Sequence, residues 1–404
     1  MAASGGGPGR TKKIFAGGFV IASVGIALFW IGGGRSSDSY FACSDTMVRF
    51  MRYLDPETAH GTTIAMMKMG LFHPVDASKR DRLRVHLWGK DVPCCVGMAA
   101  GFDKQGEVMS PLFDIGFGFV EIGGVTPKPQ IGNPKPRMFR LPKDRALINR
   151  FGLNSDGADV VRRRVALWRQ RRQSDAGGLV GVNIAKNTGS DSALEDYKNG
   201  ARKFCPDVDF VVLNMSCPNV GWTSKLGKST DVIEEIVFEV RKILEEEKMK
   251  TGRSPALLIK LGPDMSVEER RVMASLALRT GVDGIVVSNT SKTRPLSLQS
   301  DPSLVAQKGG LSGAPIKDMA TESIRDIYRV TRGRIPLVGC GGIGSAEDAY
   351  ERIRSGANLV QFYSALVYEG PSLVPRMKQG LEELLLRDGF DSVESAVGVD
   401  VREE

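Results

Sequence analysis

Polar, glycine and lysine residues follow short apolar runs at several places along the chain. The clearest are Ala99–Lys104, Gly123–Gly124, Asn214–Asn219, Ser288–Thr290 and Gly341–Gly342. Asparagine amides both donate and accept hydrogen bonds, lysines supply positive charge, and glycines let backbone N–H groups approach a phosphate. This set suits a planar, amide-rich ligand that carries a phosphate, although glycines needed only for tight turns would leave the same pattern.

Eight apolar runs predict the strands that position these residues. They are 94–99, 118–123, 179–184, 210–215, 256–261, 284–288, 335–339 and 359–363. Helical patterns separate most of them, at 230–250, 266–280, 321–331 and 346–355. Alternating β and α elements predict an α/β fold with a parallel sheet, and eight such units close into a (β/α)8 TIM barrel with its chemistry at the carboxyl ends of the strands. An open doubly wound sheet is the alternative, but it would normally carry a GxGxxG turn after its first strand, and none is present there.

The composition is that of an ordinary globular protein, with 404 residues, 42% hydrophobic, 25% charged and a net charge of +8. The basic run at 162–172 contains no aromatic residue beyond Trp168, so we interpret it as a solvated helix face and expect no nucleic-acid partner. The cysteines have neither zinc-knuckle nor CxxC spacing, and the histidines all precede the apolar runs. We therefore expect no metal site and no disulfide scaffold.

The first 34 residues predict a targeting segment followed by a transmembrane helix. Residues 14–34 contain no charged side chain, and a run of about 20 apolar residues is long enough to span a bilayer. Arg10, Lys12 and Lys13 precede the run, and the absence of acidic residues before it is mildly similar to an organellar presequence. A cleaved secretory signal is the alternative, although its apolar region would be shorter.

Residues 38–75 predict a small α-helical segment. Apolar residues recur at helical spacing from Tyr40 to Leu54, and others follow from Ile64 to Phe72 after a break at Asp55-Pro56. Two short amphipathic helices would place their apolar faces together or toward a bilayer. Methionine-rich faces adapt to flexible apolar ligands, but the spacing alone favours plain packing on the barrel.

In the predicted barrel, the chain resembles the dihydroorotate dehydrogenases, in particular the membrane-bound, quinone-reducing class 2 enzymes. The matching segments are AAGFDK (99–104), GFGFVEIGGVTPKPQIGNPKPRMFRL (116–141), INRFGLNS (148–155), GVNIAKN (181–187), NMSCPN (214–219), IKLGPD (259–264), SNT (288–290), GGLSG (309–313), GCGGI (339–343) and QFYSAL (361–366). The resemblance implies a barrel over 83–389, followed by a tail at 390–404. It also implies that the protein oxidises (S)-dihydroorotate to orotate in pyrimidine (UMP) biosynthesis.

The resemblance further implies a bound FMN and assigns residues to both ligands. Those that would hold FMN are Ala99, Ala100, Gly101, Gly123, Gly124, Asn183, Asn214, Lys260, Ser288, Gly313, Gly342, Tyr363 and Ser364. Those that would hold dihydroorotate are Lys104, Asn149, Arg150, Phe151, Gly152, Leu153, Asn214, Asn219, Asn289 and Thr290. The asparagine amides agree with this assignment, because they match the imide edges of a pyrimidine.

Three residues are candidates for catalysis. Lys104 can pair with the substrate carboxylate, and Lys260 offers positive charge where a reduced flavin accumulates negative charge. The family places a base in the loop after the fourth strand, usually serine in class 2, and that position is Cys217 here. An ordinary thiol has a pKa of about 8.5 and is partly thiolate near neutrality. We therefore hypothesise that Cys217 takes the substrate proton, with Ser216 or water as the alternative.

The class 2 resemblance implies that electrons pass to ubiquinone through a tunnel under the N-terminal helices. The residues that would line it are Met47, Met51, His60, Arg140 and Tyr363. It also implies a single-pass protein of the mitochondrial inner membrane, in contact with the lipid bilayer, and we expect a monomer.

Other functions stay open at this point. A related FMN barrel could use fumarate or a partner subunit as acceptor, or act on a different dihydropyrimidine. A barrel without redox chemistry could bind a phosphorylated substrate, and a membrane-tethered scaffold could carry a degenerate site. A yellow protein that bleaches with dihydroorotate would separate the first class from the others.

Overall fold

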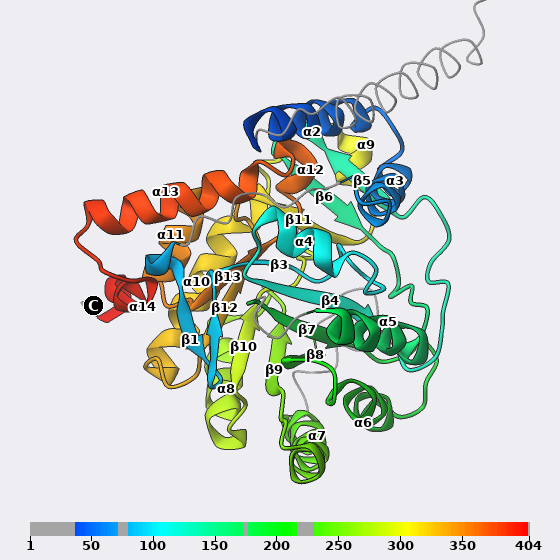
Figure 1. Cartoon of the computed structure of the whole chain (residues 1–404), viewed down its shortest axis with the longest axis vertical. Helices are drawn as coiled ribbons and strands as arrows, with labels where there is room; N and C mark the ends of the chain where they lie inside the picture. The colour runs from blue at the N-terminus through cyan, green and yellow to red at the C-terminus, as the bar shows by residue number, and fades with distance from the viewer. Residues whose placement is uncertain (1–36, 72–79, 173–176, 216–229, 403–404) are drawn as a thin grey trace, which may run out of the picture.

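A closed barrel of eight parallel strands forms the centre of the molecule (Figure 1). The computed structural model describes residues 37–71, 80–172, 177–215 and 230–402. In chain order the barrel strands are β3 (Val96–Met98), β4 (Phe119–Val125), β7 (Leu179–Ile184), β8 (Phe210–Asn214), β9 (Ala256–Leu261), β10 (Gly284–Val287), β12 (Leu337–Cys340) and β13 (Leu359–Phe362). Each overlaps one of the predicted runs, and β13 pairs with β3 to close the barrel. The prediction of a TIM barrel is confirmed.

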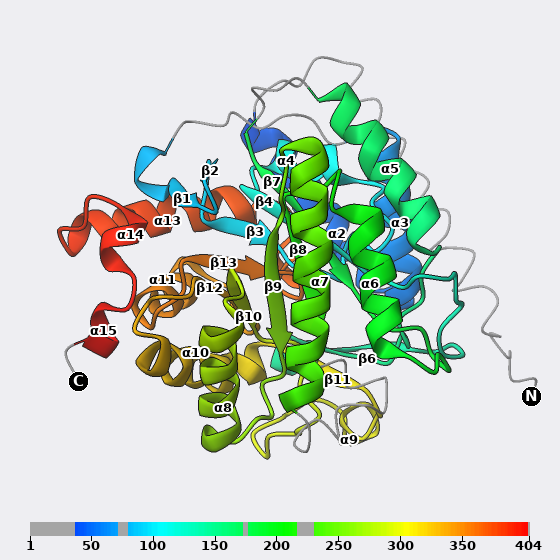
Figure 2. The ribbon, with the colours of Figure 1, turned by 90° about the horizontal axis from the view of Figure 1, so that it is seen from below.

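Helices surround the barrel on its outer side, as the view from below shows (Figure 2). They are α4 (Met109–Ile115), α5 (Ala158–Arg171), α6 (Ala193–Phe204), α7 (Thr230–Thr251), α8 (Val267–Thr280), α10 (Lys317–Thr331), α11 (Ala346–Arg354) and α13 (Leu373–Arg387). Local sequence sets their ends: Ser266 and Glu269 form a capping box before α8, and Gly281 ends that helix in the left-handed region. The four predicted helices are confirmed.

The basic run lies on α5 up to Arg171, and half of its six arginines form the solvated face that we expected. Arg162, Arg163 and Arg171 are exposed. Arg169 differs, because its guanidinium pairs with the nearly buried carboxylate of Asp209 at 2.8 Å. One arginine of the run therefore joins α5 to the amino end of β8.

Two small sheets were not predicted. A three-stranded antiparallel sheet joins β5 (Met138–Leu141) and β6 (Ala146–Asn149) to β11 (Gly310–Gly313). At the opposite end of the barrel β1 (Val85–Leu87) pairs with β2 (Lys90–Val92). The larger sheet has its own small apolar core, made by Leu141, Ala146, Ile148, Leu311 and Ile316.

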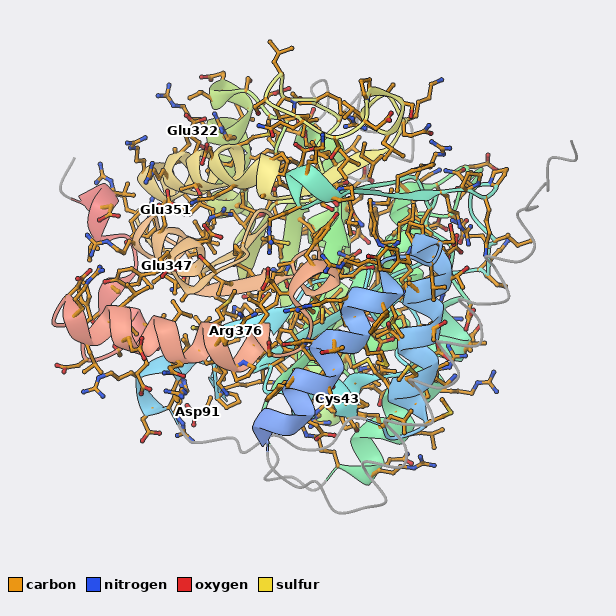
Figure 3. All side chains as sticks on the ribbon, turned by 90° about the horizontal axis from the view of Figure 1, so that it is seen from above. Cys43, Asp91, Glu322, Glu347, Glu351 and Arg376 are labelled. Carbon is orange, nitrogen blue, oxygen red and sulfur yellow. The ribbon has the colours of Figure 1, made fainter. Side chains whose placement is uncertain are left out.

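A helical pair lies at the carboxyl end of the barrel. It consists of α2 (Ser37–Met51) and α3 (Pro56–Lys68), and α3 begins where the Asp55 side chain accepts a hydrogen bond from the backbone N–H of Thr58 at 2.9 Å. Their facing sides share a cluster of Met47, Met51, Ala59 and Met66. Contacts join α3 to β5, and α2 to α12 (Leu366–Glu369). Figure 3 looks onto this face, with Cys43 on α2 and Arg376 on α13.

Short helical turns complete the described chain. They are η1 (Asp81–Leu83), η2 (Pro142–Asp144), α9 (Pro302–Val305), η4 (Ala314–Ile316), α14 (Val393–Ala396) and α15 (Val399–Arg402). The apolar segment predicted to span a membrane, residues 14–34, lies outside the described residues. Among the helices that are described, none combines the length and the apolar character that a bilayer crossing requires.

Candidate active site

A cavity of about 430 Å³ opens at the carboxyl ends of the barrel strands. Most of the residues predicted to hold FMN line it: Ala99, Ala100, Gly101, Gly124, Asn183, Asn214, Lys260, Ser288, Gly313, Gly342, Tyr363 and Ser364. Most of those predicted to hold dihydroorotate line the same space: Lys104, Asn149, Phe151, Gly152, Leu153, Asn214, Asn289 and Thr290. Residues from strand ends up to 265 positions apart in sequence therefore meet around one cavity, because parallel strands bring their carboxyl ends to the same face.

Glycines form one end of the cavity with their backbone alone. A Cβ on Gly313, at φ +97°, would lie 2.4 Å from the carbonyl oxygen of Arg145, and a Cβ on Gly342, at φ +75°, would lie 2.3 Å from Cα of Lys317. Any larger residue would therefore be both crowded and strained at these two positions. Ser364, two residues after β13, donates to the Ser312 hydroxyl at 2.8 Å. These glycines and serines all line the same cavity.

Amides cover another wall of the cavity. Asn214 Nδ2 donates to Asn183 Oδ1 at 2.9 Å, and Asn289 Nδ2 donates to Asn214 Oδ1 at 3.1 Å. Lys104 Nζ lies 2.7 Å from Asn154 Oδ1 and 3.8 Å from the centre of the Phe151 ring. A cation and several amides therefore face the same space from different elements.

Beneath this wall lies a buried ion pair that the sequence analysis missed. Lys260 Nζ is 3.2 Å from Oε1 of Glu121, and both side chains are almost completely buried. Burial lowers the pKa of Lys260, but the charge of Glu121 raises it, and the net pKa lies above the ordinary value. A single charged residue in the otherwise apolar run FVEIGG was the signal that could have identified Glu121.

Two predicted residues do not line the cavity. Gly123, at φ +102°, accepts from the N–H of Gly101 through its own carbonyl at 2.8 Å, so it ties the segment after β3 to β4. Arg150 Nη1 donates to Gln307 Oε1 at 2.8 Å, and its guanidinium stacks on Phe139. Arg150 does not line the cavity in this structure, and its contact with the substrate stays a prediction. Cys217 and Asn219 lie outside the described residues.

A second cavity, of about 90 Å³, lies between the helical pair and the barrel. All the predicted tunnel residues line it, namely Met47, Met51, His60, Arg140 and Tyr363. Most of the remaining lining is apolar, although Thr63 donates its hydroxyl to the Met51 sulfur at 3.4 Å. Arg140 Nη1 donates to the carbonyl oxygen of Leu54 at 2.7 Å and so ties the end of α2 to β5.

Tyr363 lines both cavities and separates them. Its hydroxyl oxygen is 3.4 Å from Nδ1 of His60, and both rings lie near Phe102. Burial raises the pKa of Tyr363, and burial together with the charge of Lys104 lowers the pKa of His60 to about 4. Both side chains are therefore neutral near pH 7, and this wall is polar but uncharged.

Comparison with known proteins agrees with this arrangement. The family model for dihydroorotate dehydrogenase matches residues 82–385. The mitochondrial dihydroorotate dehydrogenase (quinone) of Mus musculus is 42% identical over 371 residues, which are 91% of this chain and 92% of that protein. The corresponding protein of Azorhizobium caulinodans is 45% identical over 354 residues, 87% of this chain and 98% of its own length.

A solved structure shows the same fold. The crystal structure of DHODH from Eimeria tenella in complex with ferulenol superimposes with a TM-score of 0.82 at 38% identity, and the match covers 86% of this chain and 96% of that one. The family model spans most of the chain, and the relatives match along nearly their whole length. This chain therefore belongs to the dihydroorotate dehydrogenase family.

Proposed function

We propose that this protein oxidises (S)-dihydroorotate to orotate in pyrimidine (UMP) biosynthesis and passes the electrons to ubiquinone. The observation that carries the proposal is the meeting of two different cavities at Tyr363. The larger has the cations and amides that an anionic pyrimidine needs, and the smaller is mainly apolar, as a quinone ring requires. The relatives named above are called dihydroorotate dehydrogenase (quinone), which supports the same acceptor.

The residues of the larger cavity fit FMN. Gly313 and Gly342 line the cavity without a side chain, so their backbone N–H groups can approach a phosphate there. Lys260 provides a buried cation, and Asn183 and Asn214 provide amides for a ring with several donors and acceptors. When bound in this cavity, FMN would supply the hydride acceptor for the reaction.

The substrate would be held by charge at one end and by amides along its ring. Lys104 would pair with the carboxylate of dihydroorotate, and Asn149, Asn214 and Asn289 would match its imide groups. Phe151 would cover the ring edge and keep the Lys104 ammonium in place, since that cation already lies over its face. Such contacts orient the two reacting carbons and exclude water from them.

Cys217 would act as the base. Oxidation removes a proton from one ring carbon and a hydride from its neighbour, so some group must take the proton. In the sequence NMSCPN, Cys217 comes three positions after Asn214, the last residue of β8. A thiol becomes a thiolate far more readily than a serine hydroxyl becomes an alkoxide, so it can accept the proton with less help from neighbours.

The acceptor side would use the smaller cavity. Met47 and Met51 give it adaptable apolar walls, and the neutral pair of His60 and Tyr363 offers hydrogen bonds to quinone oxygens. An enzyme that used fumarate or a partner subunit would have no need for an apolar cavity under a helical pair. Turnover with a short-chain ubiquinone, compared with fumarate in the same assay, tests the choice, and faster turnover with fumarate would overturn it.

We also propose a place in the cell. The relatives from Mus musculus and Oryza sativa are named mitochondrial, whereas the relative from Azorhizobium caulinodans belongs to a bacterium. Together with the acid-free start and the apolar run at 14–34, these names support a protein held in the mitochondrial inner membrane by a single span. That the protein is a monomer stays a prediction. Extraction from membranes by alkaline carbonate would contradict a span, whereas a requirement for detergent is the expected result.

A further inference from the structure

A buried carboxylate organises the polar wall of the active site from behind. Glu121 on β4 is fully buried and does not line the cavity. Its oxygens accept from Asn183 Nδ2 at 2.7 Å, Gln361 Nε2 at 2.7 Å and Lys260 Nζ at 3.2 Å. We propose that Glu121 is a positioning residue, whose carboxylate holds the Lys260 ammonium and fixes the hydrogen-bonding direction of the amides that meet the substrate. This inference rests on the proposed function.

The side-chain amides of Asn183, Asn214 and Asn289 form a chain of hydrogen bonds, and the groups at its two ends fix the orientation of each amide. Glu121 can only accept, so Asn183 must turn its Nδ2 toward it and leave Oδ1 for Asn214. Asn214 then has Oδ1 left to accept from Asn289 Nδ2. At the far end the backbone N–H of Thr290 donates to Asn289 Oδ1 at 2.9 Å. An obligate acceptor and an obligate donor therefore hold one orientation of three amides, so their remaining donors and acceptors point to fixed places in the cavity.

The charge of Lys260 depends on the same carboxylate. Buried lysines tend to lose their proton, because burial in a medium of low polarity disfavours the ammonium. Two ionisable groups of the described residues act on Lys260, namely Glu121 from β4 and Cys340 from β12, and the neutral amide of Gln361 on β13 also contacts the carboxylate. With Glu121 in place the lysine stays an ammonium throughout the physiological range. Without it, we expect Lys260 to titrate at a lower pH.

The network tolerates a neutral replacement. In Glu121→Gln the new oxygen can still accept from Asn183 and Lys260, and the new amide nitrogen needs an acceptor in place of Gln361 Nε2. Gln361 Oε1 is buried and has no hydrogen-bond partner among the described residues, so a flipped Gln361 amide could accept from that nitrogen. E121Q thus removes the charge and keeps a hydrogen bond to each of Asn183, Lys260 and Gln361, while the flipped Gln361 Nε2 takes the position at which Oε1 has no partner among the described residues.

The experiment compares wild type and E121Q, both loaded with FMN, by two readouts that do not depend on turnover. The midpoint potential of the bound flavin is measured against pH, and the dissociation constant of orotate is measured by calorimetry. In E121Q we expect the potential to gain a pH-dependent step from Lys260 that wild type lacks, and that the double variant E121Q/K260Q lacks as well. The orotate dissociation constant should rise roughly fivefold, because a charge-assisted hydrogen bond to Asn183 becomes a neutral one.

Asp209→Asn is the matched control. Asp209 is also a buried carboxylate with two cations, Lys90 at 2.6 Å and Arg169 at 2.8 Å, but it lies at the opposite end of the barrel. Its loss should change stability and neither readout. If E121Q does not fold, the double variant E121Q/K260Q, which has no charge in this pair, replaces it. The orotate dissociation constant of the double variant is then compared with that of K260Q.

The outcomes distinguish a failure of the role of Glu121 from a failure of the proposed function. An E121Q protein whose potential profile or orotate dissociation constant matches wild type would overturn the role of Glu121 alone. A wild-type protein that cannot be loaded with FMN, or that dihydroorotate does not reduce, would overturn the proposed function instead.

Discussion

The two cavities that meet at Tyr363 differ in what builds their walls. The larger is formed by strand ends of a closed barrel, and its polar side chains are held by one another and by Glu121. The smaller lies under two short helices, and its methionines make few directional contacts. The comparison indicates a division of work. Under the proposed function, a rigid, polar site would select one small anionic substrate, whereas an adaptable apolar site would admit a flexible acceptor.

The largest effect should come from Cys217→Ala, which separates the two cavities chemically. We expect reduction of the flavin by dihydroorotate to slow by about 10³-fold, because the proton loses its acceptor. Oxidation of chemically reduced enzyme by quinone should stay unchanged. Stopped-flow absorbance measures both, with Cys43→Ala as a control for a cysteine on the helical pair. Near-normal reduction in Cys217→Ala would show that Ser216 or water takes the proton.

Lys104→Met should weaken orotate binding in the larger cavity, because it removes the positive charge at one end. We expect orotate to bind roughly 10- to 100-fold more weakly, because a hydrogen bond to a charged partner contributes about 1.5–3 kcal/mol. Lys186→Met is the control, since that lysine also follows a barrel strand but donates to the carbonyl oxygen of Ser190 and does not line the cavity. Equal loss of binding in both variants would argue for a general effect of surface charge.

Ala59→Trp should fill the smaller cavity and leave the larger one intact. Ala59 lies on α3 against Met47 and Met51, so an indole would occupy space meant for the quinone ring. We expect quinone turnover to fall roughly tenfold, with reduction by dihydroorotate within about twofold of wild type. The same change at Ala42, an exposed position of α2, is the control. A fall in the dihydroorotate step of Ala59→Trp would mean that the cavities are not separate.

His60→Gln should alter the pH dependence of stability, in addition to its effect on the hydrogen bonds that His60 would offer to a quinone. The pKa of His60 is lowered from about 6.5 to about 4, so the folded protein resists protonation more than the unfolded chain does. The contribution is complete above pH 6.5 and is lost as the pH falls toward 4, by about 2–3 kcal/mol. Unfolding of wild type and His60→Gln by urea between pH 4 and 7 measures the difference. Parallel curves would show that His60 titrates normally.

The barrel was predictable because each of its strands is a local apolar run bounded by glycine or polar residues. The sheet of β5, β6 and β11 was not, since β6 pairs with a segment about 160 residues later and no local pattern records that pairing. Its strands were instead included in motifs that we interpreted only as binding segments.

The site was predictable where residue type and position coincide. Lys104, Asn214 and Asn289 follow strands and carry suitable groups, and they line the cavity. Arg150 has the right type next to Asn149 but does not line the cavity, and its guanidinium donates to Gln307, which is 157 residues later in the sequence. Glu121 was missed because we considered only residues at strand ends, and Glu121 lies within β4, behind the residues that line the cavity.

Anaerobic titration of the purified protein with dihydroorotate tests the central claim most directly. We predict a yellow protein whose flavin absorbance bleaches with one equivalent of dihydroorotate and returns when a soluble ubiquinone is added. A colourless protein that cannot be reconstituted with FMN, or a flavin that dihydroorotate leaves oxidised, would contradict the account.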